Sequence, residues 1–179
     1  MTGTQVVVGV ADCRVTKDAA ASIVTYALGS CIAVAIHDPV TRVGGMLHLM
    51  LPESSLDTVK AERNPYMFAD TGIPALFRQA YAAGAEKKRL IVRIAGGAQV
   101  MDDNGTFNIG KRNCLTVKKV LWKAGVMIHA ESTGGRDSRT VRLEVDSGRF
   151  LMRTAAGPEQ ELGGRISAQA EGFVMRCQE

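Results

Sequence analysis

The chain has 179 residues, a length usual for one domain with its own hydrophobic core. Apolar residues make up 46% and charged residues 22%, which excludes the disordered and collagen-like classes. The net charge of +4 comes from scattered residues, and the densest run, residues 86–89, begins with an acid. We therefore expect a solvated helix end there and no nucleic-acid site.

Strand-like runs dominate the chain. They are rich in Val, Ile and Leu, are bounded by Gly, Pro, Asp or Ser, and lie at 5–10, 22–27, 31–37, 43–51, 90–95, 126–131, 140–145 and 149–153. Because the strands outnumber the helices and do not strictly alternate with them, the pattern favours an α+β fold with layered mixed or antiparallel sheets over a doubly wound sheet.

Helical spacing of apolar residues predicts helices over about 66–83 and 111–124, each followed by a glycine. Pro74 must lie in the first turn of the first helix or kink it. The polar segment 53–64 is predicted to be a mobile surface loop, and 102–107 to be an Asn-Gly hairpin turn.

The domain boundary is expected near residue 155. Residues 1–155 would form a single domain, and the Gly-, Ala- and Gln-rich residues 156–179 a C-terminal extension that is loosely packed or disordered. The first strand-like run follows no Lys or Arg and is short for a signal peptide, and no apolar run approaches the ~18 residues of a membrane span. We expect a cytoplasmic protein without membrane insertion.

The four cysteines are Cys13, Cys31, Cys114 and Cys177. They form no C-x-x-C pair and lie at no metal-ligand spacing from a histidine, so neither a zinc site nor a disulfide framework is expected. The Gly-Gly pairs open no nucleotide-binding pattern. We therefore predict that the protein uses no metal and no cofactor.

Residues 31–37 and 43–51 are the arms of a predicted hairpin. Residues 38–41 (Asp-Pro-Val-Thr) suit a turn with Asp first and Pro second. A symmetric loop then pairs position 37 with 42 and places Cys31 directly opposite His48. Opposed residues have Cβ atoms about 4.5–5.5 Å apart, near enough for a sulfur–imidazole contact. A shift of one residue would put them on opposite faces.

The two faces of this hairpin differ in side-chain size. One carries large apolar residues and makes a good core face: Ile32, Val34, Ile36, Val43 and Leu47. The Cys31 face carries Ala33, Ala35 and Gly44, whose small size leaves space above the thiol for a substrate chain.

Cys31 and His48 suit nucleophilic catalysis. An unperturbed thiol, with a pKa of about 8.5, is only slightly ionised at neutral pH, so it needs an imidazole to take its proton and return it to a leaving amine. The backbone N–H groups of Ser30 and Cys31 could polarise the acyl carbon if the chain turns at Gly29, which can adopt positive φ. Thr25 is a candidate to hold the His48 ring, provided that the chain folds back at 29–30 or a neighbouring strand carries it there.

The residue pattern alone leaves a plainer alternative open, in which Cys31 is a buried small hydrophobe and His48 a hydrogen-bonded core histidine. No histidine in a matching run accompanies the other three cysteines. His37, at a turn edge, and His129, within a strand, are expected to be structural.

The segment from Thr25 to Pro52 resembles the signature of the CheD family, the chemoreceptor glutamine deamidases of bacterial chemotaxis. The matching residues are Thr25, Leu28-Gly29-Ser30-Cys31, Asp38, Gly44-Gly45, His48 and Leu51-Pro52. Further matches are Tyr66 with Ala69-Asp70, AGGA at 95–98, NIGKRN at 108–113, and Gly-Gly with a following Arg at 134–139. The resemblance covers about residues 5 to 154.

The resemblance implies a cysteine hydrolase that converts receptor glutamines to glutamate and releases ammonia. It implies Cys31 as nucleophile, His48 as general base and acid, and Thr25 as the residue that orients His48. It also implies a fold like the catalytic domain of cytotoxic necrotizing factor, a receptor helical domain as protein substrate, and the CheC phosphatase as a further partner. Methylesterase activity on the same sites is chemically compatible.

Two other functions remain open at this point. One is a non-catalytic chemotaxis adaptor that binds the receptor or CheC. The other is a thiol hydrolase for a small amide, which would need a closed pocket.

Overall fold

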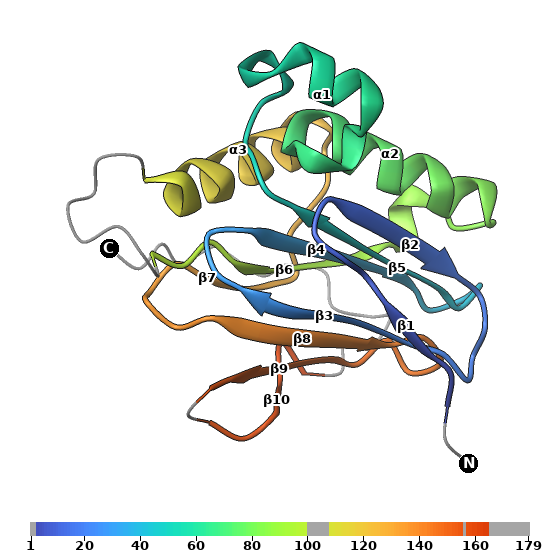
Figure 1. The fold of residues 1–179 in the computed structure, drawn as a ribbon. Helices are drawn as coiled ribbons and strands as arrows, with labels where there is room; N and C mark the ends of the chain where they lie inside the picture. Colours follow the sequence, from blue (N-terminus) through green and yellow to red (C-terminus); the bar gives the residue numbers. More distant parts are fainter. Residues whose placement is uncertain (1–2, 100–107, 156, 165–179) are drawn as a thin grey trace.

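The computed structural model describes residues 3–99, 108–155 and 157–164. Two five-stranded sheets pack face to face, and the helices cover the outer face of one of them (Figure 1). Sheet A has the strand order β1-β3-β8-β9-β10, and sheet B, which lies under the helices, has the order β2-β5-β4-β6-β7. The β1–β3 and β6–β7 pairs are parallel and the other pairs antiparallel, which confirms the predicted α+β class with mixed sheets.

The strands are β1 (Gln5–Val7), β2 (Asp12–Thr16), β3 (Ser22–Leu28), β4 (Ile32–Asp38), β5 (Val43–Leu49), β6 (Ile91–Gly96), β7 (Ala130–Thr133), β8 (Arg139–Glu144), β9 (Phe150–Thr154) and β10 (Gln160–Glu161). The α-helices are α1 (Thr58–Arg63), α2 (Ala69–Ala82) and α3 (Ile109–Lys123). Short 3₁₀ turns lie at Ser54–Leu56, Pro65–Met67 and Lys87–Arg89.

Strand β4 lies at the centre of the molecule and is buried on both faces. Its large residues Ile32, Val34 and Ile36 join the core between sheet B and the helices, as predicted. Its small residues Ala33 and Ala35 face sheet A and join the second core, between the sheets. The alternation of large and small side chains therefore sets which layer lies on each side of the strand.

The prediction of a mobile loop over 53–64 is wrong, because the segment contains a 3₁₀ turn and α1. The side chain of Asp57 caps α1 by accepting a hydrogen bond from the Lys60 N–H, and the Asp70 carboxylate accepts bonds from the Ser54 N–H (2.9 Å) and hydroxyl (2.7 Å). Helix α1 buries none of its residues, so its sequence lacks the apolar periodicity from which a helix is predicted.

Three further differences follow from weak local signals. Strand β2 was missed because it is an edge strand with the polar sequence DCRVT. Strand β7 begins at Ala130, later than the predicted 126–131. Pro74 lies inside α2, beyond the first turn.

The predicted turn at 102–107 lies outside the described residues, as do Cys177 and most of the predicted C-terminal extension. The described part of that extension includes β10, which pairs with β9 through Gln160 and Met152. The division into a domain and an extension stays a prediction.

Asp38 connects the β4–β5 turn to the segment after α2. Its fully buried carboxylate accepts hydrogen bonds from the N–H groups of Val40 and Glu86, and it forms an ion pair with Arg89 at 2.8 Å. Burial by itself raises the pKa of Asp38, but the hydrogen bonds from Arg89 and from backbone N–H groups outweigh burial and hold this pKa below its usual range.

Replacing Asp38 by Asn is therefore expected to lower the free energy of unfolding by about 3 kcal/mol, because Arg89 loses its buried charge partner and keeps only the exposed Glu86. The stabilisation from the carboxylate is present above the unfolded-state pKa of about 3.9 and is lost as the pH falls through the lower folded-state pKa. Urea unfolding at pH 7 and at pH 3 measures both effects.

The control is Asp146→Asn, which removes an exposed ion pair with Arg42. It should cost less than about 1 kcal/mol. Equal losses in the two variants would contradict a structural role for buried Asp38.

Candidate active site

The β4–β5 hairpin has a register that differs from the predicted one. His48 lies opposite Ala33, not Cys31, and Asp38 pairs with Val43. The connection runs through residues 39–42 and ends with Arg42 in the left-handed conformation (φ 53). Because the register is shifted by two residues and not by one, His48 stays on the face predicted for Cys31.

Cys31 directly precedes β4 and is therefore a diagonal neighbour of His48. Diagonal pairs have Cβ atoms about 7–8 Å apart, a separation that long side chains span. Both residues face the space between the two sheets: Cys31 packs against the inter-sheet core, and His48 makes its contact with sheet A.

Thr25 reaches His48 from the other sheet. Strand β3 belongs to sheet A and β4 to sheet B, so the chain crosses from one sheet to the other at residues 29–31. The sequence predicts that Thr25 can contact His48 only through such a fold-back or from a neighbouring strand. The fold-back does not use a positive φ at Gly29, however; the left-handed residue is Ala27 (φ 52), at an irregularity in the β3–β8 pairing.

The Thr25 hydroxyl fixes the protonation pattern of the His48 ring. Its oxygen lies 2.8 Å from the Val8 carbonyl oxygen and 2.8 Å from His48 Nδ1. The Val8 carbonyl can only accept a hydrogen bond, so the hydroxyl donates its single proton to that carbonyl. The hydroxyl oxygen must then accept the second hydrogen bond, from the Nδ1–H of His48. The neutral ring therefore carries its lone pair on Nε2, which is buried and has no hydrogen-bond partner among the described residues.

Burial keeps both reactive groups neutral. His48 is 2% exposed, and burial lowers its pKa to about 4, although the nearby carboxylate of Asp12 acts in the opposite direction. Burial also raises the pKa of the half-buried Cys31 thiol, while its own backbone N–H, close to the sulfur, lowers it in part. The resting pair at neutral pH is thus a thiol and a neutral imidazole.

The carbonyl groups before and at the nucleophile are all held by neighbouring elements. Gly29 and Cys31 accept backbone hydrogen bonds from Ala98 and Gly97, each at 2.8 Å. Ser30 accepts a bond from the Asn113 side chain at 2.9 Å. In contrast, the N–H groups of Ser30 and Cys31 donate to no other residue within the described part of the chain, although the Cys31 N–H lies close to its own sulfur.

The glycines of the AGGA motif allow this close approach. A Cβ on Gly96 would lie 2.2 Å from the Cys31 carbonyl oxygen, and one on Gly97 would lie 2.3 Å from Cys114 Sγ. Both glycines also have positive φ, which disfavours any side chain. Gly110, at the start of α3, is equally restricted, since its Cβ would lie 2.5 Å from the Gly97 oxygen.

Asn113 connects the two catalytic segments. This fully buried side chain donates from Nδ2 to the carbonyls of Ser30 (2.9 Å) and Met50 (2.8 Å). Ser30 precedes Cys31, and Met50 follows His48 by two residues. Asn113 belongs to the NIGKRN match at 108–113, but nothing in the sequence pattern shows that it reaches these two carbonyls. Val8, which acts through its carbonyl, gave no signal at all.

His37, His129 and Cys13 make their contacts away from this trio. His37 Nε2 lies 2.9 Å from the Val145 carbonyl oxygen, and His129 Nδ1 accepts from the Val92 N–H at 3.0 Å. Cys13 is buried in the core under α2, and burial raises its pKa to about 12. Among the described residues, no three His, Cys, Asp or Glu side chains gather in a way that could hold a metal ion.

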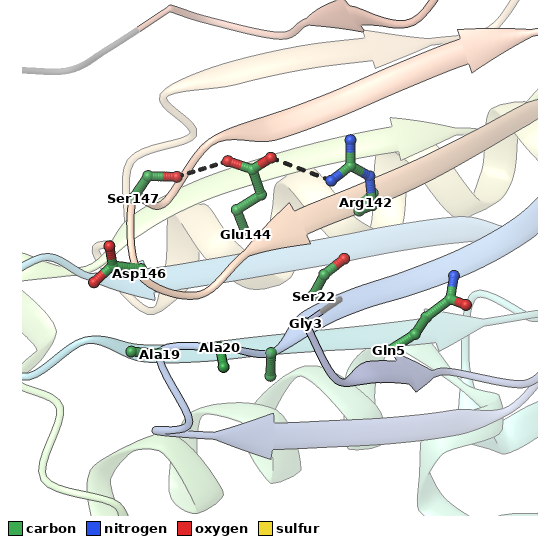
Figure 2. A pocket seen from close by; sticks show the side chains of 10 residues that line it. Gly3, Gln5, Ala19, Ala20, Ser22, Arg142, Glu144, Asp146 and Ser147 are labelled. Atoms are coloured by element: carbon green, nitrogen blue, oxygen red, sulfur yellow. Dashed lines mark hydrogen bonds and ion pairs between the residues drawn. The ribbon is translucent and has the colours of Figure 1, made fainter. Parts of the chain in front are cut away.

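A cavity of about 540 Å³ lies elsewhere, at the edge of sheet A (Figure 2). Its lining includes Gln5, Ser22, Arg142 and Glu144 but none of Thr25, Cys31 and His48. Arg142 and Glu144 pair with each other at 3.1 Å, so these charged groups in the cavity already have partners.

No helix in the described part of the chain is both long and apolar enough to cross a bilayer.

Comparison with known proteins places the chain in a family. Residues 50–154 match the family model described as CheD chemotactic sensory transduction. This match begins after His48, whereas matches to individual relatives are longer. The chain is 52% identical over 157 residues to the probable chemoreceptor glutamine deamidase CheD 1 of Syntrophus aciditrophicus, covering 88% of this chain and 98% of that protein.

Two other relatives agree. The probable chemoreceptor glutamine deamidase CheD of Solibacter usitatus is 52% identical over 158 residues, which cover 88% of this chain and 93% of the relative. The chemoreceptor glutamine deamidase CheD of Thermotoga maritima is 42% identical over 154 residues, which cover 86% of this chain and 94% of that protein. With this identity over nearly the whole described fold, the chain belongs to the CheD family.

Proposed function

We propose that this protein is a chemoreceptor glutamine deamidase, which hydrolyses receptor glutamine side chains to glutamate with Cys31 as nucleophile and His48 as base. The observation that carries the mechanism is the Thr25–His48 hydrogen bond, since it leaves Nε2 as the free, basic nitrogen of a buried ring. The relatives that bear the deamidase name support the reaction and its substrate class.

In the first half of the reaction, His48 Nε2 takes the thiol proton as Cys31 Sγ bonds to the glutamine Cδ. The carbonyl π electrons move to oxygen, and the N–H groups of Ser30 and Cys31 are the proposed donors for that oxyanion. When the tetrahedral adduct collapses, the imidazolium gives its proton to the departing nitrogen, and ammonia leaves.

In the second half, water attacks the thioester. His48 accepts a proton from the water, the C–S bond breaks, and the proton returns to the sulfur. The product is a glutamate side chain. Because the resting pair is neutral, proton transfer accompanies the attack on the substrate and does not precede it as a stable ion pair.

Three finer proposals accompany this function. A γ-glutamyl methyl ester has the same shape and a better leaving group, so methylesterase activity follows by the same path. The CheC phosphatase as a partner and a cytoplasmic location rest on the family resemblance. The layered fold is proposed to be related to the catalytic domain of cytotoxic necrotizing factor.

Cys31→Ala should abolish deamidation, because no other group can form the acyl intermediate. The measurement is mass spectrometry of a receptor cytoplasmic fragment incubated with each variant, which detects the mass increase of amide-to-acid conversion. Cys13→Ala, which removes a core thiol, is the matched control and should retain activity. Conversion by Cys31→Ala at the wild-type rate would exclude the thiol mechanism and favour a non-catalytic adaptor.

Thr25→Val should lower kcat by about 10- to 100-fold, since the ring loses the acceptor that selects its tautomer. Thr25→Ser keeps the hydroxyl and should recover most of the activity.

Because burial lowers the pKa of His48 to about 4, wild-type kcat/KM should fall only as the pH drops toward that value. Loss of activity between pH 7 and 6 would contradict a buried, neutral His48.

Asn113→Leu should lower kcat by about 10-fold or more with little change in KM, because the Cys31 and His48 segments lose their common anchor. The variant also leaves two buried carbonyls unpaired, at a cost of about 1–3 kcal/mol each. Val117→Ala, one turn along the same helix and also fully buried, controls for stability alone. If both variants lost stability and kcat in parallel, Asn113 would be structural and would not position the catalytic pair.

A further inference from the structure

The exposed side of α3 combines large apolar residues with cations. Trp122 is 75% exposed and Leu115 is 59% exposed. The buried residues of the helix are Gly110, Asn113, Val117 and Leu121. Neither Trp122 nor Leu115 is therefore part of the surface that holds the helix on sheet B.

The charges on α3 are all positive. Its sequence contains five Lys or Arg and no acid. Lys111, Arg112, Lys119 and Lys123 are exposed, and none of them forms an ion pair within the described residues. Lys118 alone is paired, with Glu131 at 2.8 Å.

These side chains lie on one face of the helix. At 3.6 residues per turn, positions seven apart lie almost directly above one another, which aligns Leu115 with Trp122. By the same spacing, Lys111 and Lys118 flank this apolar line on one side, and Lys119 lies on the other. We call this surface, made of Lys111, Arg112, Leu115, Lys119, Trp122 and Lys123, the α3 face.

Isolated exposed apolar residues and scattered lysines are ordinary surface features. The α3 face differs because its apolar centre includes a tryptophan and is bordered by cations that form no ion pair with any described residue. Tryptophan and arginine are enriched among the residues that contribute most to protein–protein binding. Such residues gather near the centre of an interface, and a polar rim surrounds them.

The α3 face begins beside the active site. In the first turn of the helix, Gly110 packs against Gly97, and Asn113 binds the carbonyl of the residue before Cys31. From there the helix runs over sheet B, away from the connection between β3 and β4 (Figure 1). Leu115 and Trp122 lie seven residues apart, about 10 Å along the axis.

We propose that the α3 face docks an acidic, amphipathic helix of the protein substrate while a nearby glutamine of that substrate reaches Cys31. This inference rests on the proposed function and names the chemistry by which the substrate is recognised. The cations, which pair with no acid among the described residues, select carboxylates, and each deamidation adds a carboxylate to the substrate. A partner helix presents apolar residues at the same seven-residue spacing, which fits Leu115 and Trp122.

The single tryptophan of the chain makes docking directly observable. Adding a purified receptor cytoplasmic fragment to the Cys31→Ala protein should shift Trp122 fluorescence to shorter wavelength as the indole leaves water. The shift should saturate and should weaken with added salt, as expected for complementary charges. This readout needs no catalysis.

Charge reversal supplies the kinetic test. Lys119→Glu combined with Lys123→Glu should raise KM for the receptor fragment by about 10-fold or more and leave kcat unchanged, because like charges then oppose the docked helix. A short glutamine peptide without the acidic helix should be deamidated by this variant at the wild-type rate. Arg153→Glu, an exposed reversal on sheet A, should affect neither substrate.

Three outcomes would overturn the docking proposal: an unchanged KM in the double variant, an equal loss on both substrates, or no fluorescence shift. Binding to vesicles of anionic lipid, with the receptor fragment having no effect on Trp122, would assign the face to a membrane surface. If the wild-type protein deamidated neither fragment nor peptide, the proposed function itself would fail, whatever the fluorescence showed.

Discussion

The hydrogen bond between Thr25 and His48 is the constraint on which the site depends, because it joins the two sheets at the catalytic ring. Thr25 lies on sheet A and His48 on sheet B, so the packing of the sheets also sets the geometry of the base. The Val8 carbonyl takes the only hydroxyl proton and thereby decides the direction of the bond. His48, the proposed general base, is thus oriented without an acidic partner in direct hydrogen-bond contact.

A neutral orienting residue suits a base that is itself buried. A carboxylate bonded to Nδ1 would favour the imidazolium and raise the pKa of His48, whereas a hydroxyl leaves the lowering effect of burial largely intact. The ring then stays unprotonated at neutral pH and is ready to accept the thiol proton. Burial also disfavours the thiolate–imidazolium ion pair of Cys31 and His48. We therefore expect the thiol proton to move only when the substrate is in place.

Cys31, the proposed nucleophile, is held through its backbone. The carbonyls of residues 29–31 accept hydrogen bonds from the backbone that follows β6 and from the Asn113 side chain of α3. Gly96 and Gly97 permit this close approach, because a Cβ at either position would collide with its neighbours. The N–H groups of Ser30 and Cys31 are not used by these contacts, which agrees with their proposed role as donors to the substrate oxygen. Helix α3 thus supports the Cys31 segment near its N-terminus, and its exposed face is the surface proposed to dock the substrate.

Local sequence was sufficient for the strands β3 to β6, for helices α2 and α3, and for the face shared by Cys31 and His48, because apolar periodicity reports which side of an element is buried. The family resemblance supplied the role of Thr25. Sequence failed for α1 and β2, which bury little, and for the hairpin register, which depends on Arg42 adopting a left-handed conformation after the turn. Only the tertiary structure decided that Thr25 binds Nδ1 from another sheet and that Asn113 joins the Ser30 and Met50 segments, since these contacts link residues far apart in the chain and leave no local periodic signal.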